Sequence, residues 1–381
     1  MKILIVGAGI AGLSMARALQ KSGLMATIIE RDKALSQQGA GIALPANATS
    51  ALDYLGLKND LNSISHQVKE IIYAKPSGKL LSRASLLDDK LGYSEFVALK
   101  PNDLLNLLHS DELKIKFNCS IESIENRKDG VSTKLTNGEE QTWDLVIAAD
   151  GINSTVSKLC FGANKPKEFN IANWRFVSEL DTKNIEPTYY LGKNTLFMIY
   201  PISDSKVYCY AHLCNSSHSK GNNAKEVLLK EFKSYVPMVK DLIQRADNDE
   251  IISSQLKSVS KIKYYDNRIV FIGDASNACS PLLQQGAASA LEDAISLANM
   301  LKNYPVSKAL HQHKAFREPR VSWIVNKSDK PLDMMVNGAS LLTIMLRNIL
   351  IRKKGPLNVQ GWRELFKEDP IKLLKQYMIA M

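Results

Sequence analysis

A glycine-rich turn near the start of the chain constrains the fold more than any other feature. Residues 2–6 (KILIV) have the β-branched, apolar character of a buried parallel strand, and the turn GAGIAG follows at residues 7–12. The spacing of apolar residues in LSMARALQKSG predicts a helix, and a second strand, MATIIE, ends at Glu30. This order is a complete β-α-β unit of a Rossmann-type sheet.

Each glycine of the turn has its own physical role. Gly7 permits the tight turn, Gly9 lets the backbone approach a pyrophosphate, and Gly12 allows the helix to pack closely on the strand. The start of the helix offers free N–H groups to phosphate, and Glu30 can accept hydrogen bonds from an adenosine ribose. The unit predicts a dinucleotide site, and by itself it leaves FAD and NAD(P) open.

Two further apolar strands end in an aspartate next to a glycine. WDLVIAADGINS (143–154) ends in Asp150-Gly151, and NRIVFIGDAS (267–276) ends in Gly273-Asp274. Ligands of open α/β sheets lie at the carboxyl ends of the strands, so the three turns are predicted to converge on one extended ligand. Asp274 can bind a ribityl hydroxyl, which favours FAD over the NAD of a simple dehydrogenase.

Five sequence blocks, in this order, resemble the FAD-dependent aromatic-ring hydroxylases, the family that contains p-hydroxybenzoate, salicylate and urate hydroxylases. The blocks are GAGIAG, Glu30, GAGIALPANATSALDYLGL (39–57), AADGINSTV (148–156) and GDASNACSPLLQQGAASALEDA (273–294). The resemblance implies a monooxygenase that reduces FAD with NADPH or NADH as a transient co-substrate. It further implies that O2 forms a flavin C4a-hydroperoxide, which hydroxylates a small aromatic, phenolic or polyketide compound.

The resemblance also implies an α/β fold in three parts. A Rossmann-type FAD-binding domain is expected at residues 1–66, 95–165 and 262–330, an interleaved antiparallel-sheet substrate domain at 67–94 and 166–261, and a C-terminal helical segment at 331–381. The expected FAD contacts are Gly7, Gly9, Ala11, Gly12, Glu30, Arg31, Gly41, Ile42, Ile121, Asp150, Asp274, Gln285, Gly286 and Ala287.

Four positions depart from the pattern of that family. They are Asn277 in place of His, Gln284 in place of a glycine of the flavin loop (residues 281–287), and Ser157 and Pro101 in place of Arg. A lysine stands beside each of the two lost arginines, but it lacks their planar, bidentate fork. These changes keep open two alternatives, a degenerate FAD-binding protein and a flavin reductase without hydroxylation; an NAD-dependent dehydrogenase is the less favoured third.

The middle of the chain has the pattern of antiparallel strands. NWRFVSEL (173–180), LFMIYPI (196–202) and KVYCYAHL (206–213) are aromatic and β-branched, and SDS between the last two predicts a hairpin turn. Alternation directs one parity of these residues toward a pocket, and the sequence leaves open which one. His212 is interpreted as a sheet residue, and no catalytic residue is assigned. The pocket candidates are Phe197, Tyr208, Tyr210 and Pro281.

Composition argues against several other functions. The net charge is +10, but the lysines are scattered, so no nucleic-acid partner is expected. The five cysteines form no CxxC pair and no metal-ligand spacing, which predicts reduced thiols, a cytoplasmic location and no metal.

No apolar run reaches the ~18 residues of a membrane span. The apolar, then basic stretch at 338–354 is expected to pack over the enzyme or to form a contact in a homodimer, rather than to touch a membrane. The protein is expected to be a monomer or a homodimer.

Overall fold

A six-stranded sheet forms one half of the molecule in the computed structural model, which describes residues 1–37, 39–88, 91, 94–162, 165–216, 223–338 and 340–380. The strand order is β18-β19-β12-β1-β2-β8, and every neighbouring pair is parallel except β18 with β19. The strands are β1 (Ile3–Val6), β2 (Ala26–Ile29), β8 (Lys114–Lys116), β12 (Leu145–Ala148), β18 (Tyr265–Asp266) and β19 (Ile269–Phe271).

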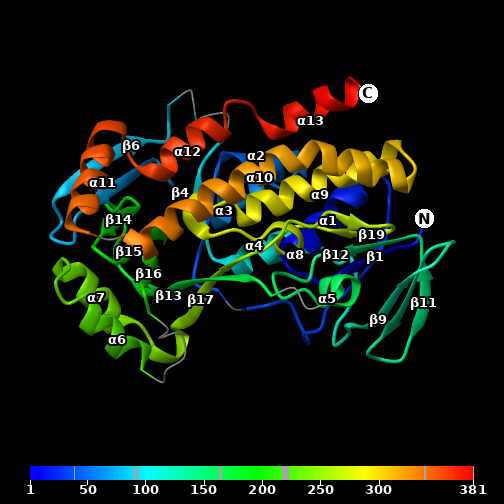
Figure 1. The fold of residues 1–381 in the computed structure, drawn as a ribbon, viewed down its shortest axis with the longest axis horizontal. Helices are drawn as coiled ribbons and strands as arrows, with labels where there is room; N and C mark the ends of the chain where they lie inside the picture. The colour runs from blue at the N-terminus through cyan, green and yellow to red at the C-terminus, as the bar shows by residue number, and fades with distance from the viewer. Residues whose placement is uncertain are drawn as a thin grey trace.

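Both faces of this sheet are covered, which explains why its central strands are apolar throughout. Ile3 and Ile5 pack toward the helices on one face, while Leu4 and Val6 pack toward a three-stranded sheet on the other. The helices are α1 (Ile10–Lys21), α2 (Ala46–Tyr54), α3 (Lys58–Ile64), α4 (Pro101–Leu108), α9 (Gly286–Asn303) and α10 (Val306–Gly338). The opposite face carries β9 (Ile121–Asn126), β10 (Val131–Leu135), β11 (Glu140–Trp143) and α5 (Thr155–Phe161). Helices α9 and α10 lie side by side across the molecule (Figure 1).

A seven-stranded sheet forms the other half, in the order β17-β13-β16-β15-β14-β5-β6. All of its pairs are antiparallel except β14 with β5. Its strands are β5 (Glu70–Ala74), β6 (Leu80–Ser85), β13 (Lys167–Glu179), β14 (Thr188–Leu191), β15 (Thr195–Ser203), β16 (Lys206–Cys214) and β17 (Ile252–Ser258). The predicted hairpin is present, because β15 and β16 pair on either side of Asp204 and Ser205.

Smaller elements join the two halves. A short sheet of β3 (Ile42–Leu44), β7 (Val97–Leu99) and β4 (His66–Gln67) lies between them, and α6 (Ala224–Glu231) and α7 (Pro237–Arg245) cover the outer face of the seven-stranded sheet. The segment after β19 contains α8 (Asp274–Asn277) and the 3-10 turn η2 (Pro281–Leu283). A second 3-10 turn, η1 (Asn248–Glu250), precedes β17.

Three helices complete the chain: α11 (Leu341–Lys354), α12 (Leu357–Leu365) and α13 (Pro370–Ile379). Helix α12 packs on η2, and α13 packs on α2 and α9. The predicted α/β fold with a Rossmann-type sheet, an antiparallel sheet and C-terminal helices is confirmed. The exact division into FAD-binding, substrate and C-terminal parts stays a prediction. Among the described residues, no helix is both long and apolar enough to cross a membrane.

Candidate functional site

The three strand ends singled out in the sequence lie next to one another. Gly7 follows β1, and a methyl group added to it would lie 2.6 Å from the Ala149 carbonyl oxygen after β12. Gly273 follows β19, and a methyl group there would lie 2.7 Å from Cβ of Ala11 in α1. Gly7 also has a φ of +103°, a conformation that side chains disfavour. The carboxyl edge of the sheet therefore gathers all three turns into one place.

The start of α1 offers unsatisfied donors at this edge. Its N-cap is Gly9, and no side chain caps the first turn. A methyl group added at Gly9 would meet nothing within 4 Å, so the backbone borders open space. Free N–H groups and the positive end of the helix dipole favour a phosphate at this position.

Glu30 comes directly after β2, beside the same turn. Its carboxylate accepts hydrogen bonds from the backbone N–H of Ala8 (2.7 Å) and of Asp32 (3.0 Å). These bonds tie the end of β2 to the glycine turn and hold the carboxylate at the adenosine end of the predicted site. The neighbouring Arg31 is exposed, with Nε 3.7 Å from Asp32 Oδ1.

Asp274 is the first residue of α8, shortly after the end of β19. Its side chain is exposed, yet protein surrounds it on most sides, and this desolvation raises the pKa of its carboxyl group. No hydrogen bond from the described part of the chain reaches the carboxylate. An accessible acceptor without a protein partner, at the meeting point of three strand ends, fits a hydroxyl group of a bound cofactor.

The start of α9 is the second helix terminus that faces the site. Gly286 is exposed, no side chain caps the helix, and a methyl group on Gly286 would meet nothing within 4 Å. Ala287 is half-buried beside it, and Gln285 is fully buried just before it. The two glycine-bordered helix starts, Glu30 and Asp274 thus fit the phosphates, the ribose and the sugar chain of FAD in their predicted order.

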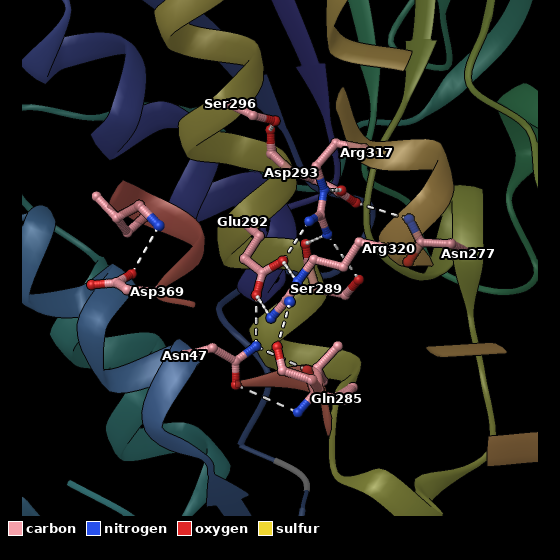
Figure 2. A network of polar contacts seen from close by, with 12 residues as sticks. Asn47, Asn277, Gln285, Ser289, Glu292, Asp293, Ser296, Arg317, Arg320 and Asp369 are labelled. Atoms are coloured by element: carbon pink, nitrogen blue, oxygen red, sulfur yellow. Dashed lines mark hydrogen bonds and ion pairs between the residues drawn. The ribbon is translucent and has the colours of Figure 1, made fainter. Parts of the chain in front are cut away.

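A buried ionic network, which the sequence analysis did not find, anchors the start of α9 (Figure 2). The carboxylate of Glu292 accepts hydrogen bonds from Arg317, from Arg320 (2.8 and 3.0 Å) and from Asn47 (2.6 Å). Asn47 also donates to the side chain of Gln285 at 2.9 Å. Asn47 in α2 therefore links the flavin loop to the carboxylate that binds the two arginines of α10. Burial by itself would raise the pKa of Glu292, but Arg320 and Arg317 outweigh it and lower the pKa to about 2.

The next residue of α9 binds the other predicted turn. Asp293 accepts hydrogen bonds from Arg317 Nε (2.7 Å), from the Gly273 N–H (3.0 Å) and from the Asn277 amide (2.9 Å). Burial opposes the charge of Arg317, yet Glu292 and Asp293 raise its pKa above the usual value. The turn that carries Asp274 is therefore fixed from behind by a fully buried carboxylate. The adjacent acids in LEDA and the i,i+3 arginines in REPR were the available sequence signal.

Asp150 has a more local role than the sequence suggested. One carboxylate oxygen accepts from the backbone N–H of Thr155 (2.7 Å) and Val156 (3.1 Å) at the start of α5. The other oxygen, Oδ1, is buried and has no partner among the described residues. Burial raises the pKa of this carboxyl group. Contact between Asp150 and a cofactor stays a prediction, for which Oδ1 is the available atom.

Two of the four departures from the family pattern have defined partners in the structure. Ser157 accepts a short hydrogen bond from Lys263 Nζ, which also lies 4.9 Å from the centre of the Phe161 ring. The cation beside Ser157 is therefore Lys263, from the loop between β17 and β18, and burial lowers the pKa of Lys263. Pro101 begins α4 and packs against Gly39, since a methyl group there would lie 2.7 Å from its ring.

Gln284 has the least ordinary geometry of the four. Its φ of 54° and ψ of 36° place it in the left-handed region, which glycine adopts at lower cost. The side-chain amide donates to the Tyr189 hydroxyl at 2.9 Å, while its carbonyl oxygen is buried without a partner among the described residues. The flavin loop is thereby linked to the seven-stranded sheet. Asn277, the fourth departure, is held by Asp293.

Register decides which aromatic residues share a face of the seven-stranded sheet. Tyr210 pairs with Arg175 and Met198, and Tyr208 pairs with Tyr200, so these side chains point the same way, toward β7 and α12. Tyr208 contacts the loop before β3, because a methyl group added at Gly41 would lie 2.2 Å from its ring. We call this surface the tyrosine face; its tyrosines are Tyr73, Tyr189, Tyr200, Tyr208 and Tyr210.

Phe197 points to the face opposite the tyrosine face, and its contact with a substrate stays a prediction. Its ring lies 6.2 Å from the ring of Phe176 and 5.4 Å from that of Phe232 in α6. Strand alternation separates it from its neighbour Met198, on the tyrosine face. Pro281 is exposed at the start of η2, and Ile42 is half-buried in β3. Ile121, the first residue of β9, is buried in the core between the six-stranded sheet and the sheet of β9, β10 and β11.

The histidines in the described part of the chain do not form a reactive group. His212 is buried on the tyrosine face, with Nδ1 3.3 Å from the Tyr210 hydroxyl, and burial lowers its pKa to about 4. His313 is buried against Ser296 at 2.8 Å, and His311 is exposed on the same helix. No group of potential metal ligands occurs in the described ranges. A groove of about 500 Å³ lies at the far end of α9, between that helix and α13, away from these residues.

Comparison with known proteins assigns the family. The family described as FAD binding domain matches residues 1–326. The chain belongs to this family. It is an FAD-dependent monooxygenase, related to the aromatic-ring hydroxylases as the five sequence blocks predicted. The fit of Glu30, Asp274 and the two helix starts to FAD agrees with that assignment.

Relatives extend over nearly the whole chain. A protein named putative FAD-dependent monooxygenase YetM, from Bacillus subtilis, is 28% identical over 352 residues, which cover 88% of this chain and 94% of the relative. An FAD-dependent urate hydroxylase from Klebsiella pneumoniae is 25% identical, and the matched region covers 97% of this chain and 100% of the relative. The crystal structure of Klebsiella pneumoniae HpxO with FAD and uric acid has a TM-score of 0.81 at 24% identity, covering 99% of this chain and 95% of that one, and so shares the fold.

Proposed function

We propose that this monooxygenase hydroxylates a small aromatic or phenolic compound, using NADPH or NADH and O2. The observation that carries the proposal is the link between the flavin loop and the tyrosine face through Gln284 and Tyr189. A substrate bound there lies between aromatic side chains on one side and the residues that follow Asp274 on the other. Aromatic side chains suit a flat ring, because stacked and edge-on contacts stabilise it.

The binding of the cofactor rests on residues already described. The N–H groups at the start of α1 would hold the pyrophosphate, Glu30 the ribose, and Asp274 a hydroxyl of the sugar chain. The exposed backbone at Gly286 would face the polar edge of the ring system. When bound, FAD supplies the redox chemistry, in which two electrons from NAD(P)H and one O2 yield a hydroxylated substrate and water.

The tyrosine face supplies hydrogen-bond donors. Burial raises the pKa of Tyr208 to about 12 and also raises the pKa of Tyr189, Tyr200 and Tyr210 above the usual value. These hydroxyl groups therefore stay protonated at neutral pH and can donate to an oxygen or nitrogen on the substrate ring. The chain would thus orient its substrate by donors and ring contacts.

The C-terminal helices would exclude water from the site. The indole of Trp362 in α12 is fully buried and donates from Nε1 to the Leu283 carbonyl oxygen at 2.9 Å. The Asn358 amide, also in α12, donates to the Tyr189 hydroxyl at 3.3 Å. These contacts place α12 against the flavin loop. Exclusion of water favours transfer of oxygen to the substrate over unproductive loss of the oxidant.

The names of the relatives support an oxygenated ring as substrate. They include urate hydroxylases, an aurachin C monooxygenase/isomerase from Stigmatella aurantiaca and a 2-heptyl-3-hydroxy-4(1H)-quinolone synthase from Pseudomonas aeruginosa. Urate and the 4(1H)-quinolone in these names are oxygenated nitrogen heterocycles. Phenols, purines, tetracyclines and quinolones are therefore the four compound classes to test.

The test is oxidation of NADPH and NADH by the purified flavoprotein in the presence of those four compound classes. We expect one class to stimulate consumption of the nicotinamide and to yield a product heavier by one oxygen atom. Anaerobic reduction of the bound flavin, followed by its visible absorbance, separates the reductive from the oxidative half-reaction. Fast oxidation without a stimulating compound or an oxygenated product would instead indicate a flavin reductase.

A further inference from the structure

Helix α11 is docked on the enzyme by one face only. Ile351 is fully buried, and Nη1 of Arg347 donates to the Gly192 carbonyl oxygen at 3.1 Å. The helix contacts β6 and α12 and lies at the edge of the molecule (Figure 1). Ser340 caps its first turn by accepting from the Thr343 N–H at 3.1 Å. These contacts fix the rotation of the helix, so its outward face is set by the fold.

The outward face of α11 is apolar. Successive residues of a helix are 100° apart, so positions i, i+1, i+4, i+5, i+8 and i+9 fall on one half of its circumference. In α11 these positions hold large apolar side chains, and all of them are exposed: Leu341 (80%), Leu342 (61%), Met345 (54%), Leu346 (49%), Ile349 (39%) and Leu350 (51%). We call these six residues the α11 face. A continuous apolar surface of this kind marks an interaction site.

Charge indicates what covers the α11 face. The helix contains no Asp or Glu, and it ends in Arg352, Lys353 and Lys354, which are all exposed. None of these three cations forms an ion pair within the described ranges. The whole chain carries a net charge of +10. The partner of this surface is therefore apolar and anionic.

A second copy of the chain fits this requirement poorly. Two α11 faces packed together would bring basic helix ends into one interface, and α11 offers no carboxylate to pair with them. Like charges at an interface oppose association. An anionic lipid surface has no such conflict, because apolar side chains enter the boundary of the acyl chains while lysine and arginine remain among the headgroups.

We propose that α11 binds the surface of an anionic lipid bilayer, with the α11 face in the boundary between headgroups and acyl chains. The helix has 14 residues and is about 21 Å long, which is shorter than the hydrocarbon core of a bilayer. It therefore lies in the plane of the surface, and the enzyme binds reversibly. The active site then operates next to a lipid surface, although the proposal does not depend on the identity of the substrate.

The test uses the full-length protein with its FAD and sedimentation with vesicles of phosphatidylcholine, either alone or mixed with phosphatidylglycerol. We expect binding to the mixed vesicles, weaker binding at high salt, and little binding to phosphatidylcholine alone. The variants Leu342→Ser/Leu346→Ser and Lys353→Glu/Lys354→Glu should each weaken binding to the mixed vesicles about tenfold or more. FAD content and melting temperature should stay unchanged, because all four side chains are exposed.

A matched control is Met25→Ser/Ile64→Ser, which removes two exposed apolar side chains outside the α11 face and should not alter vesicle binding. Absence of binding by the parent protein to the mixed vesicles would overturn the proposal, as would binding of both α11 variants at parental strength. Light scattering gives the remaining outcome. A dimer that Leu342→Ser/Leu346→Ser converts to a monomer, with no vesicle binding by the parent protein, would assign the α11 face to a second copy instead.

Discussion

Asp274 shows how one residue can be exposed and still be poorly solvated. It lies at the start of α8, where desolvation raises the pKa of its carboxyl group and no described residue donates a hydrogen bond to it. Asp150 also follows a buried strand, but one oxygen of its carboxylate accepts hydrogen bonds from two backbone N–H groups of α5. Two aspartates in similar sequence contexts therefore differ in what remains free to bind a ligand.

We expect Asp274→Ala to weaken FAD binding by roughly 10- to 100-fold, because one hydrogen bond to a charged group contributes about 1.5–3 kcal/mol. Titration of the apoprotein with FAD, followed by flavin fluorescence, measures this change. Asp129→Ala is the matched control, since Asp129 is exposed between β9 and β10, away from the site. Retention of FAD at parental affinity by Asp274→Ala would remove Asp274 from the binding site.

His313 makes stability depend on pH in a defined direction. Burial lowers its pKa to about 4, against an ordinary value of 6.5, so between these limits the unfolded chain binds a proton that the folded chain does not. The free energy of unfolding therefore falls as the pH drops through this window, by on the order of 2 kcal/mol between pH 6.5 and about pH 5. His212 contributes in the same direction.

We expect His313→Asn to flatten this part of the pH dependence, measured by urea denaturation at a series of pH values. The lost bond to Ser296 lowers stability at every pH, so the informative quantity is the slope. His311→Asn, on the same helix but exposed, should keep the slope of the parent. An unchanged slope in His313→Asn would contradict the assignment.

At the scale of elements, helix α9 holds two turns of the predicted site, the flavin loop and the turn before α8. Its start faces the predicted flavin site, and Glu292 and Asp293 inside it bind α10, α2 and the turn before α8. Because these partners are buried, removal of one charge leaves the others without compensation. The position of Asp274 therefore depends on a carboxylate that does not touch the cofactor site itself.

Asp293→Ala should destabilise the protein by about 3–5 kcal/mol, since Arg317 stays buried with a partner missing. It should also weaken FAD binding, because the Gly273 N–H and Asn277 lose their acceptor. Leu228→Ala in α6 is the control: it removes a fully buried side chain far from these turns. If both variants lower stability but only Asp293→Ala lowers FAD affinity, Asp293 is a positioning residue. If the two variants bind FAD equally well, Asp293 has a structural role alone.

At the scale of the whole molecule, residues far apart in the sequence meet around Trp362. Its ring lies 5.0 Å from that of Phe96, and its Nε1 donates to the Leu283 carbonyl oxygen in the flavin loop. The C-terminal helices, the small central sheet and the flavin loop are thus joined at one side chain. The C-terminal segment therefore packs directly on the flavin loop.

We expect Trp362→Ala to lower the free energy of unfolding by about 3–5 kcal/mol and to release FAD more readily, because η2 loses its cover. Trp362→Phe keeps most of the packing and should cost about 1 kcal/mol through the lost hydrogen bond. Trp323→Phe is the matched control, because its indole bonds to Glu364 at the surface. Thermal unfolding with and without added FAD measures both effects, and parental FAD retention by Trp362→Ala would contradict the role of α12 as a cover.

Local patterns in the sequence determined the Rossmann unit, the positions of Glu30 and Asp274, the hairpin between β15 and β16, and the cofactor class. These features follow from neighbouring residues, because strand alternation, glycine turns and helix starts are set within a few positions. Only the tertiary structure decided which face of the large sheet Tyr208 and Phe197 occupy, since parity alone does not say what covers each face. It also decided that Lys263 lies beside Ser157, that Asp293 holds the Asp274 turn, and that half of α11 stays exposed. Each of these depends on contacts between segments distant in the chain, which no local pattern specifies.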